Sequence, residues 1–257
     1  MNYSLKSVLE TAKGGIKYFY ECGNDQKQDA RFASKDCPNV SETEPHAPLV
    51  HNLKEAQSSL VSILSAWSTF STNNKITWWI SHGEMLGWYW NAQLLPWDVD
   101  LDIQMSTYQL MQLIQWNQTM IADRFLIDIA PSVFVRVPQT QNIIDARVVD
   151  TQTGYFMDIT GLTRVKEDEN VFWCKSPHSY LYDQLMPLHE TILSGVKVWR
   201  PRAVMTILKE EYSEIALYST SFKPDVKGSD LYLWNETAKA WVKDARARVN
   251  LLANMLK

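Results

Sequence analysis

The feature that most constrains this chain is the segment from Pro96 to Ile103, where acidic and apolar residues alternate as Pro-Trp-Asp-Val-Asp-Leu-Asp-Ile. Successive side chains of a β-strand point to opposite faces of the sheet. A strand over residues 98–105 would therefore carry Asp98, Asp100 and Asp102 on one face and apolar side chains on the other. The pattern predicts a half-buried strand that presents a row of carboxylates.

Three carboxylates on one face repel one another, so each raises the proton affinity of its neighbours. A divalent cation removes this repulsion, and oxygen ligands of this kind favour Mg²⁺ or Mn²⁺. A solvated strand face is the competing interpretation, but the strict spacing, the apolar opposite face and the absence of Lys and Arg favour a metal site. An EF-hand is excluded, because its loop needs glycine and glutamate where this chain has Ile103 and Gln109. Metals held in this way most often serve phosphate chemistry.

The segment Ser81-His-Gly-Glu-Met-Leu-Gly87 precedes the acidic row and follows a predicted strand, Ile76–Ile80. A glycine-containing turn that opens a helix can offer backbone N–H groups to a phosphate. A plain strand-to-helix turn is the alternative. Its place just ahead of the acidic row favours a phosphate-binding role, with His82, Gly83 and Gly87 as candidate donor-binding residues.

The remaining periodicity predicts an α+β fold with a mixed sheet and helices packed around it. We expect an N-terminal arm over residues 1–47, a main domain over 48–220 and a C-terminal helical extension over 221–257. Within them we expect helices at Pro48–Thr72, Met85–Trp90, Ser106–Met120, Arg202–Tyr212 and Thr237–Leu256, and strands at Phe125–Ile129, Val133–Val137, Ile143–Val149 and Tyr155–Thr160. A turn at Asp150–Gly154 and a hairpin at Ser194-Gly195 complete the prediction.

Composition limits the possible partners and the compartment. The formal net charge of the 257 residues is -4, which argues against nucleic-acid binding. The three cysteines, Cys22, Cys37 and Cys174, lack C-x-x-C spacing, so a zinc cluster is not expected. We find no apolar run of about 18 residues and no signal peptide. The sequence itself therefore shows no membrane span.

These segments resemble the LicD family, which includes fukutin and fukutin-related protein. The resemblance rests on His82-Gly-Glu-Met-Leu-Gly87 followed by Leu95-Pro-Trp-Asp-Val-Asp-Leu-Asp102. It continues in Asn142-Ile-Ile-Asp-Ala-Arg147 and Asp150-Thr-Gln-Thr-Gly-Tyr-Phe-Met-Asp-Ile-Thr160, which are similar to a block of the fungal members. Weaker landmarks extend it to roughly residues 17–220, among them Trp173-Cys-Lys175, Met186-Pro-Leu188 and Glu210-Glu-Tyr212.

The resemblance implies a nucleotidyltransferase fold of the polymerase-β type and an activity that moves a phosphorylated sugar or alcohol. The donor would be nucleotide-activated and CDP- or GDP-linked, and the acceptor a glycan. Fungal members are linked to mannosylphosphate transfer on cell-wall glycans. In the family pattern the next carboxylate matches Asp158, which completes a catalytic and metal-binding set with Asp98, Asp100 and Asp102. Arg136 and Arg147 would hold donor phosphates or form ion pairs, and Asp145 is a weaker candidate.

One departure concerns Glu84, because the family has Thr or Ser after the glycine of the turn. A carboxylate there would repel a phosphate. Glu84 therefore keeps open a non-catalytic regulator of glycan mannosylphosphorylation. A second alternative to the transferase is a D-x-D nucleotide-sugar glycosyltransferase, which also binds its donor through Mn²⁺. The resemblance implies the secretory pathway, whereas the absence of a signal peptide or membrane span is compatible with the cytoplasm.

Overall fold

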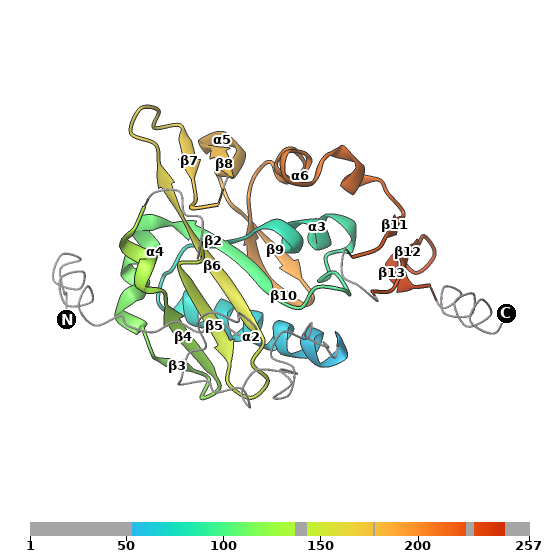
Figure 1. The fold of residues 1–257 in the computed structure, drawn as a ribbon, viewed down its shortest axis with the longest axis horizontal. Coiled ribbons are helices and arrows are strands. Elements are labelled where there is room, and N and C mark those ends of the chain that lie inside the picture. Colours follow the sequence, from blue (N-terminus) through green and yellow to red (C-terminus); the bar gives the residue numbers. More distant parts are fainter. Residues whose placement is uncertain (1–52, 137–142, 177, 225–228, 245–257) are drawn as a thin grey trace.

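The computed structural model describes residues 53–136, 143–176, 178–224 and 229–244. Its centre is a mixed sheet in the order β1-β2-β6-β5-β4-β3 (Figure 1). The strands are β1 (Trp79–Ile80), β2 (Leu101–Ser106), β3 (Met120–Ile121), β4 (Phe125–Ile129), β5 (Ala146–Asp150) and β6 (Phe156–Arg164). β2 and β6 are parallel, and the other neighbours are antiparallel. β7 (Val171–Trp173) and β8 (Ser179–Leu181) continue from β6. The α+β class and the mixed sheet are confirmed.

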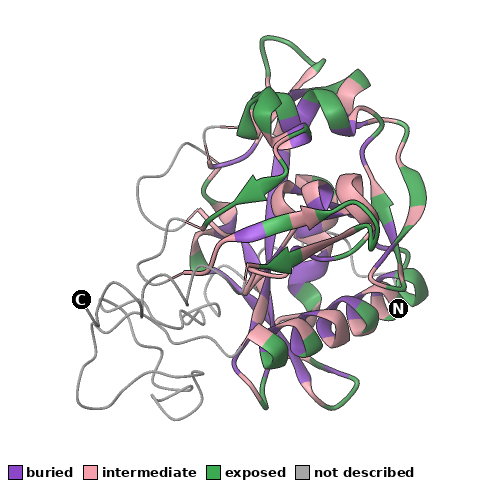
Figure 2. Cartoon of the chain, turned by 90° about the vertical axis from the view of Figure 1, so that its right-hand side faces the viewer, coloured by how far each residue is buried: buried purple, intermediate pink, exposed green. Residues whose placement is uncertain are grey.

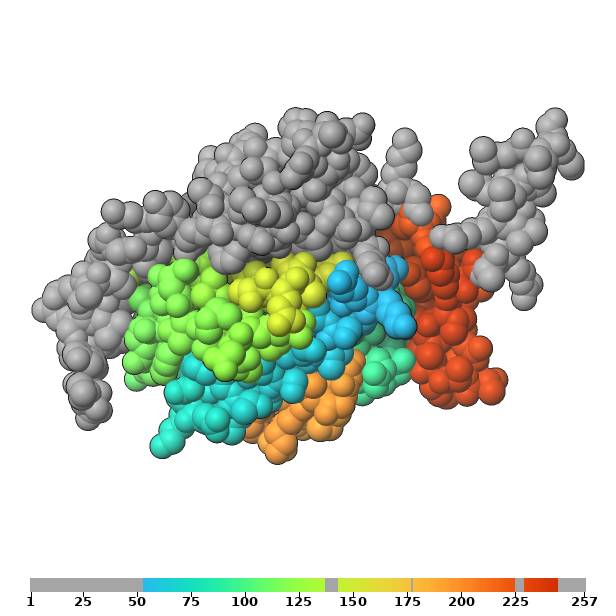
Figure 3. Space-filling view, turned by 90° about the horizontal axis from the view of Figure 1, so that it is seen from below, coloured from blue at the N-terminus to red at the C-terminus, as the bar shows by residue number. Residues whose placement is uncertain are grey.

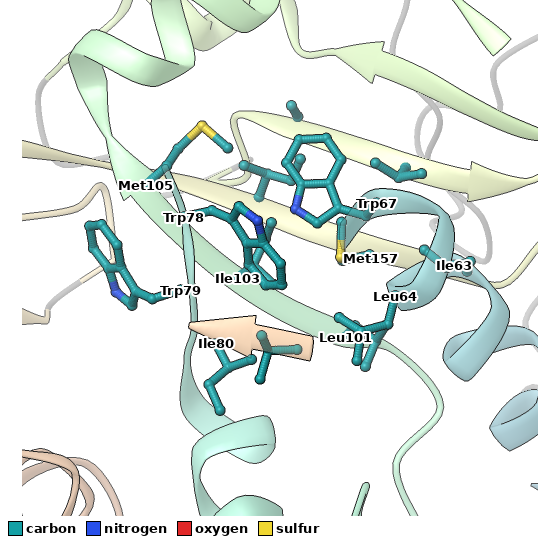
Figure 4. Packing of buried hydrophobic residues seen from close by; sticks show 14 of the residues in the cluster. Ile63, Leu64, Trp67, Trp78, Trp79, Ile80, Leu101, Ile103, Met105 and Met157 are labelled. Carbon is teal, nitrogen blue, oxygen red and sulfur yellow. The ribbon is translucent and has the colours of Figure 1, made fainter. Parts of the chain in front are cut away.

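One face of the sheet packs against α2 (Leu53–Asn73). The helix is amphipathic, and its buried stripe recurs at helical spacing (Figure 2). Leu64 and Trp67 of this stripe lie over Leu101, Ile103 and Met157 of the two parallel strands (Figure 4). Burying each such side chain contributes roughly 1.5–3 kcal/mol. The apolar half of the acidic segment thus anchors β2 to the core, as predicted. Residues 48–52 of the predicted helix lie outside the described residues.

Shorter elements surround the sheet. A hairpin of β9 (His189–Leu193) and β10 (Val196–Arg200) turns at Ser194-Gly195, as predicted. The helices are α3 (His82–Asn91), α4 (Thr107–Leu113), α5 (Tyr182–Leu185) and α6 (Val204–Tyr212), with 3-10 turns at Ile114–Trp116, Pro131–Phe134 and Glu214–Leu217. α3 packs against α6, which lies above it in Figure 1. No helix within the described residues is long and apolar enough to cross a membrane.

The C-terminal segment departs from the prediction. Residues 221–243 contain an antiparallel sheet of β11 (Ser221–Phe222), β12 (Tyr232–Asn235) and β13 (Ala240–Lys243). The predicted helix Thr237–Leu256 is therefore wrong over 237–243, and residues 245–256 lie outside the description. Cross-strand pairing of Trp234 with Trp241 and their packing on Trp90 override the helical pattern. Figure 3 shows this orange-red segment at one end of the molecule.

Three other elements differ from expectation. The predicted strand Val133–Val137 begins as a 3-10 turn, because Pro131 starts the turn at Ala130 and Val133 donates to the Ala130 carbonyl. Ser106 caps α4 as predicted, since its side chain accepts from Gln109, but α4 ends at Leu113. Of the predicted strand Ile76–Ile80, only β1 is paired. The predicted arm over residues 1–47 lies outside the described residues.

Candidate active site

The acidic segment is a loop that leads into a strand. β2 begins at Leu101, so Asp102 alone of the three aspartates lies on a strand, and the prediction of one strand over 98–105 is wrong for Asp98 and Asp100. Asp98 N–H donates to the Leu95 carbonyl, and Gln57 Nε2 donates to the carbonyls of Leu95 and Asp98 at 3.0 and 2.9 Å. These bonds to α2 hold the loop away from the sheet ladder.

The carboxylates nevertheless lie close together, near the start of the two inner strands β2 and β6. Asp102 on β2 lies directly beside Asp158 on the parallel strand β6. Strand neighbours are about 4.8 Å apart and point to the same face. Asp158 is 6% exposed. The predicted row of carboxylates along one strand is thus a cluster formed by a loop and two parallel strands.

Burial and mutual repulsion change the proton affinity of this cluster. Burial, reinforced by the charges of Asp100 and Asp102, raises the pKa of Asp98 to about 8. Burial and the charge of Asp158 raise the pKa of Asp100 to about 6, although Arg147 opposes the shift. Burial raises the pKa of Asp102 to about 7, opposed by His82 and reinforced by Asp100 and Asp158. The four aspartates therefore lie close enough to interact electrostatically, and a bound cation would reduce the repulsion between their charged forms.

Arg147 neutralises part of this charge. It faces Asp158 across β5 and β6, and its Nε lies 2.5 Å from Asp158 Oδ1 and its other guanidinium nitrogen 3.2 Å from Oδ2. Burial raises the pKa of Asp158, and the charge and hydrogen bonds of Arg147 oppose that rise. The guanidinium also lies 4.3 Å from the Phe156 ring centroid. The structure thus shows the ion-pair alternative for Arg147, and its contact with a donor stays a prediction.

Glu84 is a further carboxylate of this centre. It is 2% exposed, and its Oε2 accepts the Asp102 backbone N–H at 3.0 Å. Burial, followed by the charges of Asp102 and Asp98, raises its pKa well above the ordinary range. The sequence singled out Glu84 as a departure from the family pattern but did not place it in the site. The structure turns its side chain inward, onto the backbone of the acidic strand.

The two glycines of the turn have different roles. A methyl group on Gly83 would lie 3.0 Å from Asp98 Oδ2, so this glycine lets the Asp98 carboxylate approach the start of α3. A methyl group on Gly87 would lie 2.3 Å from the Gln93 carbonyl oxygen. Gly87 is therefore needed for the close packing of the loop after α3. Its predicted contact with a donor remains a prediction.

His82 opens α3 in an unusual backbone conformation. Its φ of 44° is left-handed, which costs a residue with a side chain about 1–2 kcal/mol. Its Nδ1 lies 2.9 Å from Glu211 Oε2 on α6. Burial lowers the pKa of His82, but the hydrogen bond and charge of Glu211, with the charge of Asp102, outweigh it and raise the pKa. The same bond lowers the pKa of Glu211 against the effect of its burial. The pair therefore favours imidazolium and carboxylate.

α6 supplies two residues that sequence reasoning noted only as family landmarks. Glu211 binds His82, as described above. The next residue, Tyr212, is 40% exposed, yet burial of its hydroxyl and the charges of Glu211, Glu84, Asp102 and Asp98 raise its pKa. Its phenol thus lies beside the acidic cluster. Their signal in the sequence was the Glu-Glu-Tyr triplet at the end of a predicted helix.

Asp145 and Arg136 form a separate cluster. Asp145, the weaker candidate of the sequence, binds Arg136 and Lys175, each at 2.7 Å from Oδ1. Its Oδ2 accepts the Gly161 N–H at 2.8 Å. Lys175 is buried and also donates to the Ser132 carbonyl. This network is buried and internally bonded, so it reads as structural.

The carboxylates of the cluster are suitable ligands for a hard divalent cation, because each offers anionic oxygen atoms. Within the described ranges, no group of three or more His, Cys, Asp or Glu side chains is arranged so that it could hold a metal ion. Ion binding at Asp100 and Asp102 stays a prediction that the donor chemistry supports.

The comparisons with known proteins agree with these motifs. Residues 75–203, half of the chain, match the family model described as LicD/FKTN/FKRP, nucleotidyltransferase domain. Two proteins of Saccharomyces cerevisiae (strain ATCC 204508 / S288c) are similar: Mannosyltransferase regulator 4, at 30% identity over 203 residues, and Mannosyltransferase regulator 14, at 35% over 172. These alignments cover 72% and 62% of this chain but 16% and 18% of those proteins, so the chain spans less than a fifth of their length.

Among solved structures, the lincosamide antibiotic adenylyltransferase LnuA, with lincomycin bound, is similar at a TM-score of 0.38 and 13% identity. That alignment covers 61% of this chain and 92% of the other. The family match includes both the turn at the start of α3 and the acidic loop, and it ends just before α6. On this match, the chain belongs to the LicD family.

Proposed function

We propose that this domain is a metal-dependent transferase that moves a phosphorylated sugar or alcohol from a nucleotide diphosphate donor to a glycan. The observation that carries the proposal is the cluster of Asp98, Asp100, Asp102 and Asp158. Asp102 lies beside Asp158 on parallel strands, and partial burial together with the charges of neighbouring aspartates raises the pKa of Asp98, Asp100 and Asp102. Carboxylates with perturbed pKa values are concentrated at functional sites.

Asp100 and Asp102 are the first choice to hold Mg²⁺ or Mn²⁺, with Asp98 or Asp158 adding a further oxygen. A cation at this place would neutralise charge that builds on the transferred phosphate. Arg147 orients Asp158 through its bidentate bond and opposes the rise in the pKa of Asp158 that burial causes. The side-by-side placement of Asp102 and Asp158 on parallel strands supports a nucleotidyltransferase fold of the polymerase-β type.

The start of α3 is the proposed contact for donor phosphates. The first N–H groups of a helix have no partner within it and attract anions. Ser81, the residue before the helix, is fully buried, and its N–H donates to the Asp102 carbonyl. The Glu84 carboxylate is bonded inward to the Asp102 amide through Oε2, so the contact proposed for a phosphate is with the N–H groups of His82 and Gly83.

The proposed reaction is a displacement at phosphorus. A bond forms between the acceptor hydroxyl oxygen and the phosphate next to the transferred group, the bond to the nucleoside monophosphate breaks, and a carboxylate of the cluster takes the hydroxyl proton. A glycan acceptor and a CDP- or GDP-linked donor are proposed from membership of the LicD family. The two yeast relatives are named mannosyltransferase regulators, which supports mannose-containing glycans as acceptors.

Product analysis tests this proposal. The domain is incubated with Mn²⁺, an oligomannose acceptor and GDP-mannose or a CDP-linked donor, and the products are identified by mass spectrometry. Transfer with a retained phosphodiester and release of the nucleoside monophosphate would support it. Release of nucleoside diphosphate would show a D-x-D glycosyltransferase instead. Asp102→Asn should abolish transfer, whereas Asp183→Asn, on exposed α5, should leave it unchanged.

A second candidate is a non-catalytic regulator of glycan mannosylphosphorylation. The names of the two yeast relatives favour it, as does Glu84 at a position where the family pattern has Thr or Ser. A regulator would bind its partner enzyme without turnover. Donor binding without any product, in a protein that retains its fold and its metal, would favour this candidate.

A further inference from the structure

The start of α3 is held from outside the family match by a buried hydrogen-bond network. Glu211 of α6 accepts from the Tyr180 hydroxyl at 2.7 Å through Oε1 and contacts His82 Nδ1 at 2.9 Å through Oε2. Gln104 of β2 donates to the same Tyr180 hydroxyl at 3.0 Å and receives a bond from Trp79 at 3.2 Å. The network joins α3, α6, β8, β2 and β1. Glu211 lies at its centre, with both carboxylate oxygens in use.

What the network holds is the strained first residue of α3. The left-handed backbone of His82 persists only if its surroundings fix it. Its ring lies between Glu211 on one side and Gln104, at 3.4 Å from Nε2, on the other. The His178 ring lies 5.1 Å away. Of these three contacts, the one to Glu211 is the shortest and is charge-assisted.

The residues that follow His82 touch the acidic cluster directly. Gly83 borders the Asp98 carboxylate, and the Glu84 side chain accepts the Asp102 N–H. Ser81, on the other side, donates its N–H to the Asp102 carbonyl at 3.1 Å. A displaced His82 would therefore shift its neighbours in the chain, Ser81, Gly83 and Glu84, and with them their contacts to Asp98 and Asp102. This chain of contacts runs from α6 to the proposed metal ligands.

We infer that Glu211 is a positioning residue of the active site: through His82 it fixes the first turn of α3 against Asp98 and Asp102. The expected effect on metal binding rests on the proposed function, whereas the positioning of α3 by Glu211 does not. It extends the centre to α6, beyond the matched residues 75–203. A simple stabilising ion pair would instead affect the whole fold evenly and leave the acidic cluster unchanged.

The test compares Glu211→Ala with Glu210→Ala. Glu210 is the matched control, because it neighbours Glu211 but takes part only in a solvent-exposed hydrogen bond, which its carboxylate accepts from Gln184. Two quantities are measured on folded protein: Mn²⁺ affinity, by electron paramagnetic resonance of free Mn²⁺, and amide hydrogen exchange by NMR. We expect Glu211→Ala to weaken Mn²⁺ binding at least 5-fold. We also expect faster exchange at Glu84 and Asp102 than at Ile127 and Val148 on the far strands, with neither change in Glu210→Ala.

Unchanged Mn²⁺ affinity together with unchanged exchange at Glu84 and Asp102 would overturn the inference. So would an even rise in exchange across both regions, because that is the effect of a purely stabilising pair. If Glu211→Ala does not fold, Glu211→Gln, which keeps the size and one acceptor oxygen, is judged by the same criteria. If the wild type binds no Mn²⁺, the proposed metal site fails, and amide exchange alone decides the role of Glu211.

Discussion

Replacing Asp98 by Asn should stabilise the metal-free protein at alkaline pH. The pKa of Asp98 is raised to about 8, so the folded protein keeps this proton in a range where the unfolded chain has lost it. Stability therefore falls as pH rises from about 4 to about 8, because the native state binds more protons. A shift of about four units corresponds to about 5–6 kcal/mol at full ionisation. Partial solvent access screens the repulsion, so we expect about 2 kcal/mol.

The assay is urea unfolding in EDTA, followed by tryptophan fluorescence, at pH 5 and pH 8.5. Asp98→Asn should exceed the wild type by about 2 kcal/mol at pH 8.5 and by a smaller amount at pH 5, where only part of the pH-dependent loss has occurred. The control is Asp183→Asn on exposed α5, which should show no such pH dependence. An Asp98→Asn variant that is less stable than the wild type at pH 8.5 would refute the account of buried, mutually repelling carboxylates.

Three further predictions follow from the same structure. Mn²⁺ at 100 times its dissociation constant should stabilise the wild type by about 2.7 kcal/mol in urea unfolding but not Asp102→Asn, and equal stabilisation of both would contradict the site. Gly87→Ala should lower the free energy of unfolding by about 2–3 kcal/mol, because its methyl group meets the rigid Gln93 carbonyl. Gly83→Ala should lower it by less than about 1 kcal/mol, because its methyl group meets only the end of the Asp98 side chain. Equal losses of stability in thermal unfolding would argue against this difference. Asp150→Ala should cost about 3 kcal/mol by calorimetry, since it leaves Arg124 without its bidentate partner, and a loss below about 1 kcal/mol would contradict that.

The local patterns of the sequence were sufficient for most of the sheet. Phe125–Ile129 was predicted at its observed bounds because it is a short run of aromatic, aliphatic and β-branched residues, interrupted only by Asp128. The hairpin was predicted from the Ser194-Gly195 pair, which is typical of a tight turn. Helix α2 was predicted from apolar residues that recur at helical spacing over many turns. Asp102 and Asp158 were identified as candidates from motifs, and the strand pairing places them side by side.

Long-range contacts account for what the sequence could not show. β2 starts late because Gln57, far along the chain, binds the carbonyls of the acidic loop. The C-terminal strands form because Trp241 and Trp234 pack on Trp90, which a local helical pattern cannot register. The partner of His82 lies 129 residues away on α6, so no spacing rule could have found Glu211.

The most direct test of the central claim is a thermal-unfolding panel with CDP-choline, CDP-ribitol, GDP-mannose and UDP-sugars, each with and without Mn²⁺. The wild type is compared with the double variant Asp100→Asn/Asp102→Asn. The account predicts that one nucleotide raises the unfolding temperature only when Mn²⁺ is present, and that the double variant loses this rise while remaining folded. No rise with any donor, in a wild-type protein that unfolds cooperatively, would contradict the transferase and favour the regulator.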